Sequence, residues 1–258
     1  MPWPLGAPAA VGAAFLLLPL AALVVRAPWS GFGRLLEARQ VSQALQLSLL
    51  CATSATAISL VLGVPLAWVL ARAGGRGIWF LRALVTLPLV LPPVVGGVAL
   101  LYSLGRQGLV GRWLYDWTGL SFPFTTAGVV LAETFVAMPF LVVTLESGFR
   151  AADAGLEEAA ATLGAGRLRT FRRVTLPLVL PSLLAGSVLC WARALGEFGA
   201  TITFAGNSPG RTQTMPLAVY LALETDPEAA VALSLVLLVV CVAILALLRD
   251  RWLGWGTR

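Results

Sequence analysis

The sequence predicts an all-α membrane protein with about six transmembrane helices. Of its 258 residues, 59% are hydrophobic and 12% are charged, and the mean hydropathy is +0.88. Soluble domains carry about a quarter charged residues. One bilayer crossing needs roughly 20 apolar residues, so about six crossings fit this length and leave the remainder for connections. The composition therefore favours a single transmembrane domain over residues 1–258 rather than an anchor on a large soluble domain.

Apolar runs bounded by charged residues mark the expected crossings. Several runs are longer than one crossing requires, so we expect tilted helices or helices that continue beyond the lipid. Prolines within or beside the runs are expected to kink or end them. The runs lie at residues 9–25, 45–71, 79–104, 126–145, 178–204 and 229–248, and the prolines are Pro65, Pro88, Pro92, Pro93, Pro139 and Pro181.

The arginines predict the orientation of the chain. Most of them fall on the side that holds the N-terminus, the connections after the second and fourth spans, and the C-terminus, which the positive-inside rule assigns to the cytoplasm. The arginines directly after the first span, Arg26, Arg34 and Arg39, favour the opposite local orientation. Because residues 1–8 carry no positive charge, the first span is interpreted as a retained helix rather than a cleaved signal.

Residue types that are absent exclude several chemistries. The chain has no histidine, and all 18 of its basic residues are arginine. Without lysine it cannot form a Walker A phosphate loop, and without histidine it lacks His-based zinc sites and nucleophilic triads. Residues 206–210 match G-x-S-x-G, but Pro209 has no N–H to serve as an oxyanion donor. We therefore expect no catalytic site, and any ATP must be bound by another chain.

The remaining reactive or charged features have simpler interpretations. Cys51, Cys190 and Cys241 are far apart and lie in apolar runs, so we interpret them as small hydrophobic residues and expect no metal site. The net charge of +6 comes from arginines that mostly flank apolar runs. This placement favours topology signalling over nucleic-acid binding.

The connection between the fourth and fifth spans, residues 150–176, is predicted to be an ordered helical hairpin. Apolar residues spaced i, i+3, i+4 and i+7 form one stripe of a helix, with Asp153 as N-cap and Gly164 placed to end it. A basic helix over residues 166–174 follows. The pattern fits a rigid knob that contacts a partner and also a helix lying on the bilayer. The stripe consists of Leu156, Ala159, Ala160 and Leu163.

The spacing within this connection resembles the EAA signature of binding-protein-dependent ABC importer permeases, E-A-A-x3-G-x9-I-x-L-P. The one departure is Val174 in place of isoleucine. The resemblance implies a type I permease fold in which residues 150–176 form the coupling helix that enters a groove on a cytoplasmic ATPase. The implied coupling residues are Glu158, Ala159, Ala160, Gly164, Leu176 and Pro177.

Further stretches are similar to the molybdate/tungstate branch of these permeases. The sulfate/thiosulfate branch, which tends to carry tyrosine where this chain has Phe198, is the alternative. The resemblance implies a homodimer in the bacterial or archaeal inner membrane, two ATPase copies that bind ATP and Mg²⁺, and an extracytoplasmic oxyanion-binding protein. No cofactor is expected in this chain. The stretches are residues 87–97, 105–111, 191–201, 205–207 and 212–218.

Ionisable residues within the fifth span mark a candidate pathway or helix-pairing site. Arg193 and Glu197, at i and i+4, are expected either to neutralise each other or to meet the passing oxyanion. Thr201, one turn further, is expected to add a hydroxyl to that face. Phe198 and Gly199 complete the candidate set, the glycine as a packing contact or pathway lining. The role of Glu133 in the fourth span stays open.

Composition alone also allows a secondary transporter or channel. Such proteins often contain internal repeats with interrupted helices in matching positions. The two halves of this sequence show no convincing self-similarity. Residues 215–224 are apolar but too short to span a bilayer, so we expect a re-entrant or surface helix there.

Overall fold

The computed structural model describes residues 3–33 and 39–253, and within these ranges the regular elements are all helical. The all-α prediction is confirmed. Five of the described helices are long and apolar enough to cross a membrane, or six when one bent pair is taken as a single span. Backbone contacts group the chain into two compact units, Gln46–Gln213 and the pair of segments Met1–Leu45 and Thr214–Arg258.

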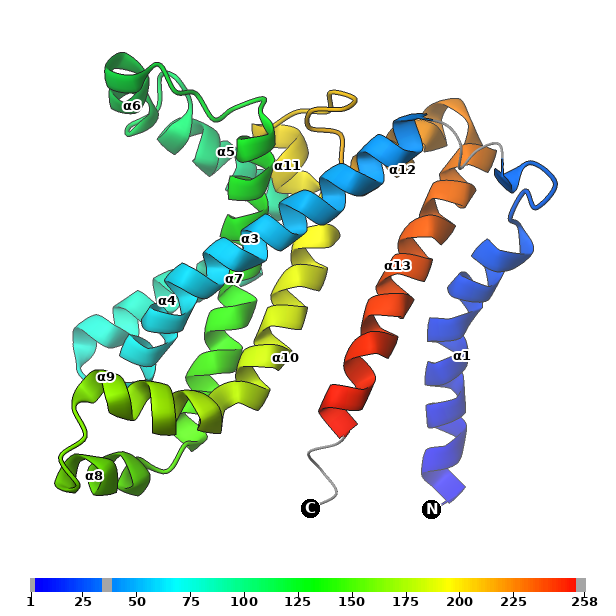
Figure 1. The fold of residues 1–258 in the computed structure, drawn as a ribbon. Helices are drawn as coiled ribbons and strands as arrows, with labels where there is room; N and C mark the ends of the chain where they lie inside the picture. The colour runs from blue at the N-terminus through cyan, green and yellow to red at the C-terminus, as the bar shows by residue number, and fades with distance from the viewer. Residues whose placement is uncertain (1–2, 34–38, 254–258) are drawn as a thin grey trace. The chain divides into compact units, whose positions relative to one another are not determined.

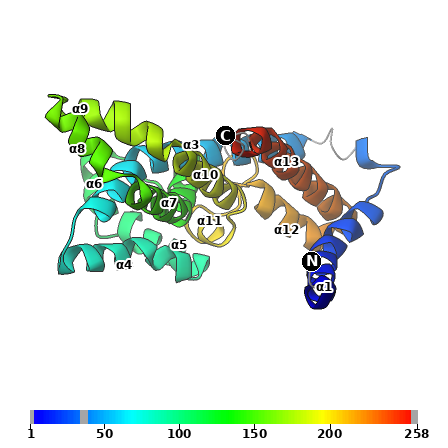
Figure 2. The same cartoon turned by 90° about the horizontal axis from the view of Figure 1, so that it is seen from below.

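The unit Gln46–Gln213 is organised around α7 (Thr126–Ala151). Figure 2 shows α10 on one side of α7 and the α4–α5 pair on the other. Leu141, Leu145 and Phe149 of α7 are fully buried. The other elements are α3 (Arg39–Arg72), α4 (Arg76–Val90), α5 (Pro93–Leu104), α6 (Gly111–Thr118), α8 (Ala154–Thr162), α9 (Arg167–Thr170), the π-helical turn η1 (Phe171–Thr175), α10 (Leu176–Leu195) and α11 (Gly199–Phe204).

The third expected span is not one continuous helix. Residues 79–104 were predicted to cross as a unit, but α4 and α5 meet at a bend of 119°. Leu91 takes an extended conformation, which the residue before a proline favours, and Pro92 and Pro93 lack the N–H groups that would continue the α4 ladder. The prolines, which were expected to kink or end the runs, divide this one into two helices.

The fifth expected span is also interrupted. It was predicted over residues 178–204, but the helical run begins earlier, at Arg167, and α10 ends at Leu195. Residues 196–198 leave the helix before α11 begins at Gly199. The interruption occurs where Gly196 caps α10 and where the Glu197 side chain accepts a hydrogen bond from the Ala200 N–H.

The two short helices that follow these interruptions, α5 and α11, lie against each other (Figure 1). Their backbones approach closely at Gly97, where a Cβ atom would lie 2.7 Å from Thr203 Cβ and 2.8 Å from the Ala200 carbonyl oxygen. Real Cβ atoms do not make contacts this short. The packing of α5 on α11 therefore requires glycine at position 97.

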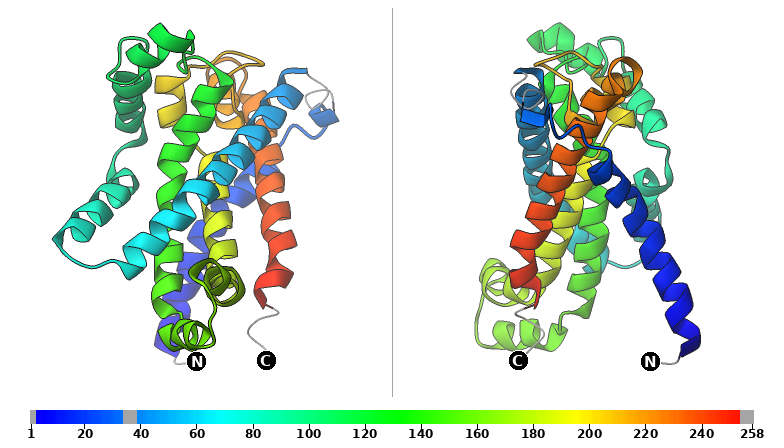
Figure 3. Two further views of the ribbon diagram at one scale, coloured as in Figure 1. Left: turned by 60° about the vertical axis from the view of Figure 1, so that its left-hand side comes forward. Right: turned by 90° about the vertical axis from the view of Figure 1, so that its right-hand side faces the viewer.

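The second unit contains α1 (Trp3–Val25), the first residues of α3, α12 (Met215–Thr225) and α13 (Pro227–Leu253). Figure 3 shows α1 and α13 diverging toward the two termini. A small core joins Ala44, Met215, Ala218 and Leu233. One face of α12 is thus buried, and the expectation of a re-entrant or surface helix stays a prediction. Along α1, by contrast, large apolar side chains such as Phe15 and Leu18 are exposed, as suits a helix that meets lipid.

Candidate functional site

The polar hairpin, which we define as residues 154–175 of α8, α9 and η1, follows the caps predicted from the sequence. The Asp153 carboxylate accepts a hydrogen bond from the Gly155 N–H at 2.8 Å. Gly164 has a φ of 79°, a left-handed conformation that favours glycine, and its N–H donates to the Ala161 carbonyl at 3.0 Å. These two residues fix where α8 begins and where the chain turns back.

The apolar stripe of α8 is not covered by the described part of this chain. Leu156 is 46% exposed and Leu163 is 88% exposed. Glu158 is also exposed, and within residues 3–33 and 39–253 its carboxylate makes no hydrogen bond or ion pair. Exposed apolar side chains of this kind mark protein–protein or membrane contact sites.

The EAA-type residues are distributed along the hairpin rather than gathered at one point. Glu158, Ala159 and Ala160 lie on α8, and Gly164 lies at its end. Leu176 and Pro177 begin α10, where a proline is favoured because the first N–H groups of a helix have no partner within it.

The neighbouring carboxylate, Glu157, is less exposed and connects the hairpin to α3. Its Oε1 atom lies 2.6 Å from Nη2 of Arg72, the last residue of α3. The same oxygen accepts a hydrogen bond from the Thr175 hydroxyl at 2.9 Å. Thr175 is buried and belongs to the π-helical turn η1. The sequence analysis did not single out Glu157, since the EAA spacing draws attention to Glu158.

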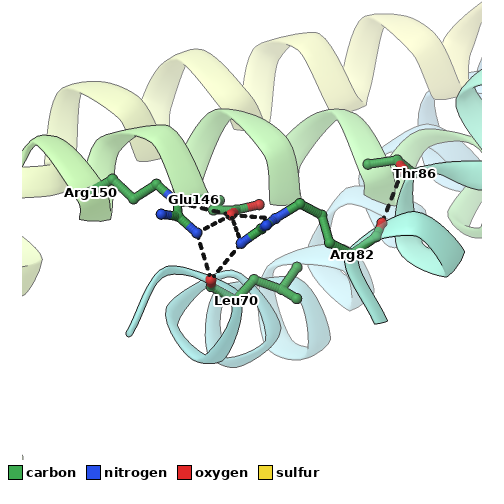
Figure 4. Close-up of polar contacts among 5 residues, drawn as sticks. All are labelled: Leu70, Arg82, Thr86, Glu146 and Arg150. Atoms are coloured by element: carbon green, nitrogen blue, oxygen red, sulfur yellow. Dashed lines mark hydrogen bonds and ion pairs between the residues drawn. The ribbon is translucent and has the colours of Figure 1, made fainter. Parts of the chain in front are cut away.

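A second ionic cluster lies beside the same end of α3 (Figure 4). Arg82 of α4 and Arg150 of α7 both donate to Glu146 Oε1, at 2.8 and 3.0 Å, and both donate to the Leu70 carbonyl at 3.0 Å. The last carbonyls of a helix lack N–H partners, and the helix end carries partial negative charge, so two guanidinium groups suit this position. The sequence analysis missed this cluster. The i,i+4 spacing of Glu146 and Arg150 could have indicated that pair, whereas Leu70 and Arg82 are 80 and 64 positions from their partners on α7.

The candidate pair within the fifth span is formed. Arg193 Nη2 lies 2.6 Å from Glu197 Oε2, and Glu197 Oε1 accepts from the Ala200 N–H at 2.8 Å. Glu197 is 1% exposed and the Arg193 side chain 26%. Glu197 therefore both neutralises the arginine and caps the first turn of α11.

Two other candidates of this span occupy different positions. Thr201 is fully buried, but among the described residues its hydroxyl has no hydrogen-bond partner, so it does not join the Arg193–Glu197 pair. Thr201 was expected to share a helix face with Arg193 and Glu197. The helix is interrupted at residues 196–198, so that continuous face does not exist. Gly199 packs against Pro93 and Val94 of α5, and Phe198 lies within the interruption, partly buried.

Glu133 of α7 is a further buried carboxyl group in this unit, besides Glu146 and Glu197. It is 1% exposed, and its Oε2 atom has no hydrogen-bond partner in the part of the chain that the structure describes. Its carboxyl group interacts electrostatically with that of Glu197.

Comparison with known proteins identifies the family. The model of the binding-protein-dependent transport system inner membrane component matches residues 60–255. The chain belongs to this family. It is therefore the permease of an ABC importer, a multi-pass membrane component, as the EAA-type spacing indicated.

Individual relatives agree with this assignment. The permease is 52% identical to the molybdenum transport system permease protein ModB of Mycobacterium tuberculosis over 97% of this chain and 92% of that protein. It is 45% identical to the protein of the same name in Escherichia coli K12, over 82% of this chain and 93% of that protein. The sulfate transport system permease protein CysT of Salmonella typhimurium is 36% identical over 94% of this chain and 89% of that protein.

A solved structure supports the fold. A bacterial ABC transporter that imports the acidic polysaccharide alginate superposes with a TM-score of 0.77, at 20% sequence identity, and covers 99% of this permease and 96% of that chain. At this identity the likeness concerns the fold alone. The predicted ABC importer permease fold is thus confirmed.

Proposed function

We propose that this permease carries molybdate, and its analogue tungstate, into the cytoplasm. The observation that supports this substrate is the 52% identity over nearly the whole chain to a molybdenum transport permease. Sulfate is the second candidate, supported by the 36% identity to a sulfate permease. Both substrates are tetrahedral dianions, so either one places the same physical demands on the pathway.

A dianion is costly to move through a low-dielectric region, so its path must be wet or lined with hydrogen-bond donors while it is occupied. A strong fixed positive charge would hold the ion and slow its release. Arg193 is instead neutralised by Glu197 at 2.6 Å. This pairing suits a conduit that binds its substrate weakly and leaves selection to the extracytoplasmic binding protein.

Transport is driven by a separate ATPase, in the proposed assembly of two permeases and two ATPase subunits. This chain has no lysine and so no Walker A loop, and ATP with Mg²⁺ would be bound by the ATPase. The exposed residues of α8 and its C-cap, Leu156, Glu158 and Leu163, would enter the ATPase groove. ATP binding would close the ATPase pair, draw the two α8 helices together and open the pathway outward.

The direct test is uptake of labelled molybdate into vesicles that contain the permease with its cognate ATPase and binding protein. We expect uptake that requires ATP and that excess tungstate, but not sulfate, inhibits. Strong inhibition by sulfate would move the assignment to the sulfate branch. Uptake by the permease without ATPase would contradict the ABC mechanism and favour a secondary transporter.

A further inference from the structure

Two adjacent carboxylates of α8, Glu157 and Glu158, differ in exposure and in their partners. Glu158 is exposed and unpaired among the described residues, whereas Glu157 is held by Arg72 at 2.6 Å and by Thr175 at 2.9 Å. Successive residues of an α-helix point about 100° apart, so Glu158 can face solvent while Glu157 contacts Arg72. Glu157 therefore has a role that the EAA-type spacing does not assign.

The ion pair between Glu157 and Arg72 lies beside a cavity that side chains do not fill. The backbone of α8 packs against α9 and η1. A cavity of about 380 Å³ lies between α8, the α9–η1 segment and Trp68 of α3, and both Glu157 and Glu158 are among the residues that line it. Within residues 3–33 and 39–253, no other side chain of α8 makes a hydrogen bond or ion pair to a different helix. Glu157 is thus the polar connection from α8 to the end of α3.

The end of α3 is itself fixed to the rest of its unit. Two residues before Arg72, the Leu70 carbonyl accepts hydrogen bonds from Arg82 of α4 and Arg150 of α7, each at 3.0 Å. A force applied to α8 would therefore reach α3 through Glu157, and α4 and α7 through the adjacent ionic cluster. Breaking the Glu157 link would leave α8 joined to the bundle through its chain connections and through its packing against α9 and η1.

We propose that Glu157 is a positioning residue that transmits displacement of the coupling helix to α3 through its ion pair with Arg72. This inference rests on the proposed function, because it requires that an ATPase moves α8. Loss of the link lets ATP hydrolysis proceed while less of the motion reaches the transmembrane helices. The quantity that reports the loss is the number of ATP molecules hydrolysed per molybdate imported.

The experiment compares Glu157→Gln with the parent in vesicles that contain the complete transporter. We expect ATPase activity to persist and the ATP-to-molybdate ratio to rise by about tenfold, in the usual range of coupling between two sites. The double exchange Arg72→Glu with Glu157→Arg should return the ratio to within about threefold of the parent, because only an interacting pair is rescued in this way. Asp116→Asn, which breaks the exposed Arg112–Asp116 pair of α6, is the control and should leave the ratio unchanged.

Two results would overturn the inference. One is an ATP-to-molybdate ratio in Glu157→Gln equal to that of the parent. The other is a double exchange whose ratio is no lower than those of Arg72→Glu and Glu157→Arg alone. If Glu157→Gln fails to assemble, Thr175→Val removes one hydrogen bond and no charge, and its ratio should rise by about threefold. An unchanged ratio there overturns the inference as well. Failure of the parent to import molybdate would contradict the proposed function instead, so the two failures are distinguishable.

Discussion

The Glu146 carboxylate and the Leu70 carbonyl oxygen are held by the same two guanidinium groups. Arg82 and Arg150 each donate one hydrogen bond to Glu146 Oε1 and one to Leu70, at distances of 2.8 to 3.0 Å. The four groups come from α3, α4 and α7 (Figure 4). The planar fork of arginine, with several N–H groups, makes this double bridge possible.

Arg82→Lys should therefore destabilise the permease although it keeps the positive charge. A lysine ammonium lacks the fork that reaches both Glu146 and Leu70, so one hydrogen bond is lost, at a cost of about 1 kcal/mol. Thermal unfolding of the purified permease in detergent measures the effect. Arg76→Lys, at an exposed position of the same helix, is the matched control, and equal melting of the two variants would argue against the bridge.

Glu158→Arg should leave the bundle folded and abolish productive contact with the ATPase. Glu158 is exposed and unpaired among the described residues, so its replacement disturbs no contact within this chain. The new charge joins a hairpin that already carries Arg167, Arg169, Arg172 and Arg173. ATP-driven molybdate uptake is the measurement, and uptake at the parental rate would refute the coupling role of this surface.

Arg193→Ala should lower both assembly and stability. It leaves Glu197, which is 1% exposed, as a buried carboxylate without its cation, and breaking a buried pair in this way costs about 3 kcal/mol. Arg193→Met combined with Glu197→Gln removes both charges and should cost less. The yield of intact transporter and its melting temperature measure the difference. Parental behaviour of Arg193→Ala and of Glu197→Ala would show that the pair is dispensable.

Gly97→Ala should destabilise the contact between α5 and α11 by roughly 1–3 kcal/mol, the cost of overpacking. The added methyl group would meet Thr203 and the Ala200 carbonyl at under 3 Å. Gly77→Ala on α4 is the control, because a Cβ atom there has no neighbour within 4 Å and alanine is the better helix former. Equal melting temperatures of the two variants would contradict the close approach.

The sequence predicted what depends on composition and on short-range spacing. Apolar runs located most of the spans, and Asp153 and Gly164 marked the limits of α8, because capping acts within a few residues. It left open whether residues 79–104 are kinked or divided, since Pro92 and Pro93 are compatible with either. Nor did it predict the contacts of Arg72 with Glu157 and of Arg82 with Glu146, because they join residues 85 and 64 positions apart.

The π-helical turn η1 sets the rotational phase between the polar hairpin and α10. A π-helical turn contains an additional residue compared with an α-helical one. Deleting one residue from 171–175 would convert the turn to regular α-helix and rotate the preceding segment by about 100° relative to α10. Thr175 would then no longer face Glu157. The length of this short segment, and not only its composition, therefore determines the direction in which the surface of α8 points.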